Sequence, residues 1–433
     1  MIDMLALIAK FQAQNLMTRI NEHSIARDWS RGRWDSTDRT RDNLLPKPTD
    51  VAGQDAFNRL QRQVQSAGPR ALRAKLDAAI GTINWGGDNP NQIDAKLSAL
   101  ELDALAEKLA TDALITGIAA VIASTPIDGQ PAEISRLSGY LEPILKPGNV
   151  DRITGLFQCW QELQGNKPVW IVRVYDFDEL EMREWRNLGH PGALAGTPTI
   201  TANASMPRVF VPYMDDDGLV LGEFVIALPR LKALYATEFR LLRVEELAAF
   251  PRLLLKGDVK VENAGSPASI LRASKDGGDA KFLEPGNMEQ LRHQRSSRRE
   301  DLRDDLALPG GFLGNDSPSG EALREANTRY YQASRKLAQQ ISRLLSNVVR
   351  DYSVLEDVTD PPNVVVNPNY EFMRDLVVQN TLALHGAGLI PLAIATREIQ
   401  VFFPGWADED MEAFIASREG VVDPASVQAL LGG

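Results

Sequence analysis

The segment "SPSGEALREANTRYYQASRKLAQQISRLLSNVVRDY", residues Ser317–Tyr352, has the longest helical pattern in this chain. Neither glycine nor proline occurs between Glu321 and Asp360, and Ser317-Pro318 form a capping residue and a first-turn proline. Apolar residues recur at helical spacing along one stripe: Leu323, Ala326, Tyr330, Ala333, Leu337, Ile341, Leu344 and Val348. We predict one helix longer than roughly 45 Å, at about 1.5 Å per residue.

The pattern before this helix alternates between helical and strand-like stretches. The first 124 residues are mainly helical, and residues between Gly139 and Ile226 read as strands and turns. Within that region "MPRVFVPYMDDDGLVLGEFV" predicts a β-hairpin whose turn is DDDG. A helix, "ALPRLKALYATEFRLLRVEELAAF", then runs to Pro251, and a short strand-bearing segment and a polar helix follow. The whole pattern predicts an α+β fold.

Composition and charge limit the function. The chain has 433 residues, 44% of them apolar, which suffices for a packed core and suggests two to three domains. A net charge of -11 is unlike that of a protein that grips DNA through its phosphates. One cysteine, Cys159, and four scattered histidines predict no internal disulfide, no metal site and no cofactor.

The chain has no apolar run of membrane-spanning length and no secretory signal at its start. The longest apolar run, Ala113–Ala123, is about half the length of a bilayer span. We therefore expect a soluble protein that has no membrane partner and is assembled in a reducing cytoplasm.

The stretch "YMDDDG", Tyr213–Gly218, contains the Tyr-Met-Asp-Asp sequence of reverse transcriptases. A two-metal site needs a third carboxylate on a separate strand well upstream. The nearest candidates, Asp176 and Asp178, precede the motif by only about 35–40 positions. Asp and Gly are also the common residues of tight turns, so we interpret the stretch as a turn. We predict no catalytic residues; the open alternative is a metal-dependent nucleotidyl transferase that uses Asp215 and Asp216.

The polar helix, residues 287–308, has an unusual charge arrangement. Like charges recur at four-residue spacing, which is repulsive within one helix: Arg295, Arg299 and Arg303, then Glu300 with Asp304 and Asp301 with Asp305. Asp301 lies about 160° around the helix from Arg299, at about 100° per residue. Copies placed side by side in a ring would set each basic face against an acidic neighbour. The alternative is a charged helix that faces solvent.

Taken in order, these elements resemble the portal proteins of tailed double-stranded DNA bacteriophages, the head-tail connectors. The motif Ser319-Gly320-Glu321-Ala322-Leu323 is similar to the start of the long helix in one portal family. "YLEPILKPGN" followed by "VWIVRVYD", and "LKALYATEFRLLRVEELAAFPRLLLKG", add to the resemblance. It covers roughly residues 109–404 and leaves the first hundred residues without a match.

The resemblance implies a portal-like fold with named parts. These are a mainly helical N-terminal region that is part of the wing (1–108), the α/β wing (109–228), a first stem helix (229–255), a strand-containing clip (256–286), a second stem helix (287–308), a tunnel loop (309–320), a long tunnel or wing helix (321–352) and a C-terminal wing with a short crown-like tail (353–433). Because the last part is short, the crown is expected to be reduced or absent.

The resemblance also implies a function. Portal proteins form a ring, twelve copies in the particle and thirteen in some isolated rings, at one capsid vertex. Double-stranded DNA passes through the ring during packaging and ejection without sequence-specific contacts. The expected partners are terminase, a head-tail adaptor, and the major capsid and scaffolding proteins, and the expected location is the virion, after assembly in the host cytoplasm. The open alternative is another head-completion or capsid-associated ring component.

Two groups of residues carry these expectations. The tunnel loop would line the DNA channel through Pro309, Gly310, Gly311, Phe312, Leu313, Gly314 and Asn315. The stem would form contacts between subunits through Arg295, Arg299, Arg303, Asp301 and Asp305.

Overall fold

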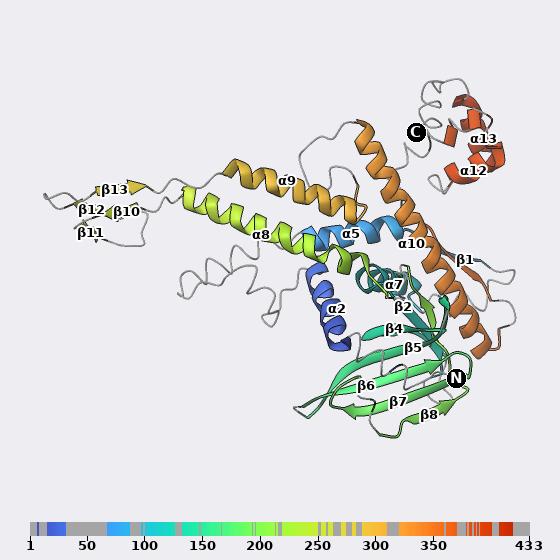
Figure 1. Cartoon of the computed structure of the whole chain (residues 1–433). Helices are drawn as coiled ribbons and strands as arrows, with labels where there is room; N and C mark the ends of the chain where they lie inside the picture. Colours follow the sequence, from blue (N-terminus) through green and yellow to red (C-terminus); the bar gives the residue numbers. More distant parts are fainter. Residues whose placement is uncertain are drawn as a thin grey trace. The chain divides into compact units, whose positions relative to one another are not determined.

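The computed structural model describes most of the helices and strands of the chain (Figure 1). The described residues are 15–31, 67–86, 100–125, 132–212 without 147, 148, 166, 193 and 195, then 219–249, 288–309, 320–358, 361–369, 390–400 and 407–418, four short strands within 253–282, and a few single positions. The chain divides into two compact units. One contains residues 1–16, 73–222 and 320–433, and the other contains 17–72 and 223–319.

A five-stranded antiparallel meander is the largest sheet of the first unit. Its strands, in order, are β4 (Tyr140–Lys146), β5 (Asn149–Gln164), β6 (Lys167–Asp176), β7 (Glu181–Leu188) and β8 (Thr199–Ala202). β-Branched and aromatic residues in "KPVWIVRVYD" favour the pleated conformation of β6. The predicted strand region is therefore confirmed here.

A cross-strand charge ladder fixes the register of β5, β6 and β7. The guanidinium of Arg173 lies 5.0 Å from the ring centroid of Trp160 and donates from Nε to Glu184 Oε2 at 2.5 Å. Arg186 donates to the other oxygen of Glu184. Burial alone would raise the pKa of Glu184, but the hydrogen bonds from both arginines outweigh burial and hold that pKa below its ordinary value.

A second sheet packs on the first. Strands β3 (Glu133–Arg136), β2 (Ala119–Ser124) and β9 (Arg208–Phe210) form it, with β9 at one edge. The two sheets share an apolar cluster that includes Ala120 of β2, Leu156 of β5 and Tyr175 of β6. Because side chains alternate along a strand, Ala119 and Val121 point to the opposite face of β2.

The long helix α10 (Gly320–Leu355) covers that opposite face, together with α7 (Leu102–Thr116). Of the predicted stripe on α10, the described residues Tyr330, Leu337, Ile341, Leu344 and Val348 are buried, while Ala333 is half-buried. Most apolar residues of α7 are buried as well. The predicted long helix is confirmed.

Two serines on α10 hold the strand formed by residues Asn363–Val366. The hydroxyls of Ser342 and Ser346, one helical turn apart, accept the backbone N–H groups of Val366 and Val364 at 2.8 and 2.9 Å. This strand, β14 (Asn363–Val366), pairs with β1 (Ile83–Gly86), which the sequence analysis did not predict. Near the C-terminus, α12 (Leu392–Gln400) and α13 (Asp408–Arg418) enclose a small apolar cluster around Ile399.

The second unit contains α2 (Leu16–Ser30), α8 (Glu223–Ala249) and α9 (Met288–Asp305), and the unit boundary falls inside α5 (Ala67–Ala79). Four short strands lie between α8 and α9. β10 (Leu253–Lys256) pairs with β13 (Asp279–Phe282), and inside this pair β11 (Val259–Glu262) pairs with β12 (Ile270–Ala273). The nested pairs match the strand-containing insertion that the sequence predicts.

Two sequence predictions are wrong in detail. Among the described residues, the stretch around DDDG does not form a hairpin of two strands, because β9 pairs with β2 and an isolated antiparallel bridge joins Met214 to Val220. The residues of the turn itself, 215–218, lie outside the described part of the chain. The helix expected over 229–255 begins at Glu223 and ends at Ala249, before Pro251. Pro229 lies inside it, at its seventh residue, where the proline ring removes one helical N–H donor.

A substitution at Gly222 tests how closely α7 packs against the segment that leads into α8. A methyl group on Gly222 would lie 2.1 Å from the carbonyl oxygen of Ile115, a backbone atom that cannot swing away. Gly222→Ala should therefore lower the free energy of unfolding by about 2 kcal/mol or more, measured by urea denaturation. Gly189→Ala is the matched control, because nothing lies within 4 Å of its added methyl group. Equal denaturation midpoints for the two variants would contradict this packing.

Candidate functional site

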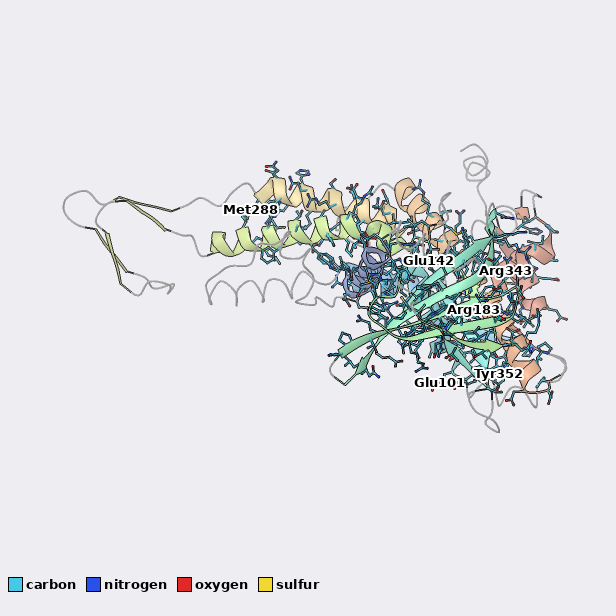
Figure 2. The ribbon with its side chains drawn as sticks, turned by 60° about the horizontal axis from the view of Figure 1, so that its bottom comes forward. Glu101, Glu142, Arg183, Met288, Arg343 and Tyr352 are labelled. Atoms are coloured by element: carbon cyan, nitrogen blue, oxygen red, sulfur yellow. The ribbon has the colours of Figure 1, made fainter. Side chains whose placement is uncertain are left out.

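The charged face between α8 and α9 is the candidate site. The two helices lie side by side, and Figure 2 labels Met288 at the start of α9. Of the eighteen residues of α9, only Leu302 is buried. A helix that is polar on all sides needs partners for its charges, because it buries little apolar surface. The contacts of α9 are therefore mainly contacts of arginine side chains.

Arg298 makes the most buried of these contacts. Its Nη1 donates to the carbonyl oxygen of Ala233 and to the hydroxyl of Thr237, both on α8. Thr237 is almost completely buried. The hydroxyl of Thr237 in turn donates to the same carbonyl of Ala233 at 3.0 Å, so one guanidinium satisfies a small polar group of atoms inside the helix pair.

Arg299 forms the central ion pair. Its Nη2 and Nε both donate to Oε1 of Glu238, at 2.6 and 3.1 Å, and the glutamate side chain is 12% exposed. At this degree of burial the pair is screened less than a surface pair, so it contributes to holding α9 on α8.

Two further arginines pair the ends of the helices. At one end, Arg230 of α8 donates to Asp305 Oδ1 at 2.6 Å and to the backbone oxygen of Asp301 at 3.2 Å. At the other end, Nη2 of Arg292 lies 3.7 Å from Oε1 of Glu245, and both side chains are largely exposed. The numbering of α8 rises as that of α9 falls along these contacts, so the two helices are antiparallel.

The predicted stem residues do not all behave alike. Arg299 and Asp305 have partners within their own chain, and Arg303 pairs with its neighbour Asp304 at 3.0 Å. Arg295 is half-buried on the side of α9 that carries Arg298 and Leu302, whereas the side chain of Asp301 is exposed. The ion pair of Arg299 with α8 thus offsets part of the repulsion among Arg295, Arg299 and Arg303. The spacing of the charges alone could not show this contact.

The outer face of α9 is acidic. Glu289, Glu300, Asp301 and Asp304 are all exposed on the side of α9 away from Leu302, at about 100° per residue. On α8, Arg240 is exposed as well. Within the described residues, no ion pair or hydrogen bond involves the side chains of Arg240 or Glu300. The helix pair therefore presents both signs of charge to its surroundings.

The base of α8 is anchored by aromatic contacts from α2. The rings of Trp29 and Tyr235 meet edge to face with centroids 5.1 Å apart, and Lys232 Nζ lies 5.6 Å from the Trp29 ring centroid. The hydroxyl of Tyr235 accepts the backbone N–H of Gly68 at 3.0 Å. Burial raises the pKa of Tyr235 well above its ordinary value, so this hydroxyl stays protonated.

The predicted tunnel loop lies almost entirely outside the described residues. Pro309, four residues after the end of α9, is half-buried, and Gly310, Gly311, Phe312, Leu313, Gly314 and Asn315 are not described. Asp215 and Asp216 of the alternative polymerase motif also lie outside the described residues.

The two upstream carboxylates considered for a polymerase site have structural roles. Asp176 Oδ1 accepts the backbone N–H groups of Asp178 and Glu179, both at 3.2 Å, and so closes the β6–β7 turn. Asp178 forms an ion pair with Arg152 at 3.1 Å. Within the described residues, no group of three or more His, Cys, Asp or Glu side chains is placed to hold a metal ion. Burial and the nearby Glu142 carboxylate raise the pKa of the Cys159 thiol, which makes it unreactive.

No helix in the described part of the chain is both long enough and apolar enough to cross a bilayer. Models of known protein families give no match to this sequence, and no curated protein sequence matches it.

Among similar solved structures are three chains of gene transfer agent particles. A chain from the neck of an empty particle, computed with C6 symmetry, has 16% identity and a TM-score of 0.44, over 76% of this chain and 88% of that one. A chain from the virion of a native particle has 16% identity and a TM-score of 0.41, over 85% and 94% of the two chains. A chain from the neck of a native particle, computed with C12 symmetry, has 15% identity and a TM-score of 0.41, over 84% and 89%. At these values the likeness assigns no function to this chain.

Glu238, Thr237 and Arg298 were not predicted from the sequence as partners across the helix pair. The signal that could have found them is the antiparallel order of two neighbouring helices with a short insertion between them, which brings residues 233–238 opposite 298–299. Choosing the register among several arginines and glutamates required the structure.

Arg298 offers a test of how α9 is held. Arg298→Met should leave the Thr237 hydroxyl and the Ala233 carbonyl without their charged donor, at a cost of about 1.5–3 kcal/mol. Hydrogen exchange of the α9 amides should then be about tenfold faster or more, as measured by mass spectrometry. Arg292→Met removes an exposed and long ion pair and should change exchange by less than about fivefold. Similar exchange rates for both variants would show that the buried contact does not hold the helix.

Proposed function

We propose that this protein is a portal protein, a ring-forming channel component of a phage-like particle, and that it is not an enzyme. Support comes from the order of its elements, which agrees with the order in the portal family that the sequence resembles. A two-sheet region precedes α8, two nested strand pairs separate α8 from α9, and α10 follows a glycine-rich segment. In this proposal α8 and α9 form the stem, the strands β10–β13 form the clip, and residues 309–320 form the tunnel loop.

The observation that carries the proposal is the exposed acidic face of α9. This helix buries a single side chain within its own chain, and its arginines are largely used by α8. Neighbouring copies in a ring would cover its outer face. Because that face is acidic and the flank of α8 carries the exposed Arg240, the two surfaces can meet head to tail, the arrangement that closes into a ring.

The charge of the chain suits a channel that lets DNA slide. At -11 per copy, a ring repels the phosphates of DNA as a whole, so the polymer would not be trapped by many phosphate contacts. Phe312 and Leu313 of the proposed tunnel loop offer no hydrogen bonds to phosphates. Terminase and a tail adaptor would dock at the strand module, and capsid and scaffolding proteins at the outer parts of the ring.

A charge exchange tests the ring proposal. Asp301→Arg and Arg240→Asp, each alone, should place like charges at the subunit contact and reduce the population of rings at least about tenfold at micromolar concentration. The double variant restores opposite charges and should recover rings. Mass photometry measures this directly, because twelve chains of 47.7 kDa have a mass of 12 × 47.7 ≈ 572 kDa.

Asp103→Arg provides the control, since it makes the same change at an exposed position on α7. Rings of unchanged abundance in both single variants would exclude these two residues as the contact. A wild-type chain that stays monomeric would exclude the ring itself.

A further inference from the structure

The β5–β6 hairpin continues past the sheet to which it belongs. Pairing between β4 and β5 ends at Cys159, and pairing between β6 and β7 begins at Trp170. Beyond these points, residues 161–164 of β5 pair with 167–170 of β6. We call residues 160–169 the arm; Figure 1 shows the two strands in the sheet. In the part of the chain that the structure describes, no other strand pairs with the tip of the arm.

The two faces of the arm differ. Leu163 pairs with Pro168 on one face, and at 77% exposure Leu163 is the most exposed large apolar side chain among the described residues. Glu162, Gln164 and Lys167 lie on the other face, because side chains alternate along each strand. Trp160 anchors the arm at its base through Arg173 and donates from Nε1 to Glu162 at 2.9 Å. An apolar residue is thus presented to solvent on a fixed strand pair.

A groove of about 520 Å³ lies at the other end of β5 and β6, between the β6–β7 turn and the edge strand β9 of the second sheet. β9 is the last strand of its sheet, so its outer edge is not paired to any described strand. One wall of the groove is apolar and includes Phe177, Leu180 and Met206. The opposite wall is the face of α10 that carries Gln340, Arg343 and Asn347. Arg343, labelled in Figure 2, is exposed, and no described residue pairs with its guanidinium.

The rim of the groove is fixed in place. Leu180 has a positive φ of 54°, which is uncommon for a branched residue, and its side chain is 48% exposed. Its carbonyl accepts the N–H of Ala204 at 3.0 Å, and Asp176 closes the turn that contains it. Backbone strain of this kind persists only where the surrounding contacts hold it. The groove therefore exists before any partner arrives.

Arm and groove cannot meet within one chain. They lie at opposite ends of β6, a strand of ten residues, and are about 30 Å apart at about 3.3 Å per residue. Two complementary surfaces at opposite ends of one rigid sheet define a head-to-tail contact between copies. The free edge of β9 can also accept backbone hydrogen bonds from an added strand.

We propose that the arm of one copy docks in the groove of the next copy, with Leu163 on the apolar wall and Glu162 toward Arg343. This inference rests on the proposed ring, to which it adds a second subunit contact besides the stem. The face of the arm with Leu163 matches the apolar wall of the groove, and the face with Glu162 matches the wall that carries Arg343. This match indicates that the occupant of the groove is a second copy of this chain.

Disulfide trapping tests the contact in the full-length protein. Leu163→Cys combined with Leu180→Cys should, on mild oxidation, give a ladder of covalent oligomers on a non-reducing gel. Native Cys159 is fully buried and takes no part. Ile200→Cys combined with Leu180→Cys is the control, because Ile200 is an exposed apolar residue on β8, away from the arm. It should give no ladder.

Assembly provides an independent readout. Leu163→Asp, and separately Arg343→Glu, should raise the concentration at which half of the chains are in rings by about tenfold or more. Glu162→Arg added to Arg343→Glu should restore it. Unchanged circular dichroism spectra would confirm that the variants fold, since each substituted side chain is exposed.

The outcomes separate the two proposals. If the wild-type chain forms rings but the ladder is absent and the variants assemble normally, the arm contact is wrong and the ring stands. If the wild-type chain stays monomeric, the proposed function fails and the arm contact with it.

Discussion

Helix α9 needs partners outside itself for its charged side chains, and this constraint governs the arrangement proposed for the whole chain. Only one of its apolar side chains is buried. Arginine contacts therefore hold α9 against α8, as an apolar stripe holds other helices in place. Arg298 and Arg299 reach buried or half-buried acceptors on α8, and such contacts are strong because few water molecules compete for them. Once those arginines are used, the acidic side of α9 remains exposed within the described part of the chain, and this is the face that we propose a neighbouring copy covers.

The first unit is held together differently, by the close packing of small and apolar residues. Small residues let layers approach: Ala119 and Ala120 of β2 lie between α10 and the larger sheet, and Gly117 and Gly222 bring two backbones into contact. Dense packing of this kind makes a rigid body. A rigid sheet can present different surfaces at its two ends with a fixed spacing, which an assembly of repeating copies requires.

Much of the fold could be predicted from the sequence, because the period of the apolar residues is strong in the long elements. The stripe that includes Ile341 and Val348 predicts α10, and the β-rich run 167–176 predicts β6. Short elements were missed for physical reasons. β1 has four residues and is held by β14, far away in sequence, and in the run 113–123 only Thr116 and Gly117 interrupt the apolar residues where α7 ends and β2 begins.

The candidate site was predicted only in part. The spacing of Arg295, Arg299 and Arg303 predicted contacts between subunits, which stays a prediction; within the chain, Arg299 pairs with Glu238 on α8. Spacing could not distinguish a partner on α8 from one on another copy, because both satisfy the same charge. The arm at Leu163 and the groove at Leu180 were not foreseen, since they depend on strand lengths and on a turn with positive φ.

The account makes one central claim, that copies of this chain close into a ring around an axial channel. Electron microscopy of the purified wild-type protein, viewed down the symmetry axis after two-dimensional averaging, tests it most directly. The account predicts closed rings of twelve subunits, or thirteen for the isolated protein, with an open central hole. Averages that show single particles of one chain, or open chains without a hole, would contradict it.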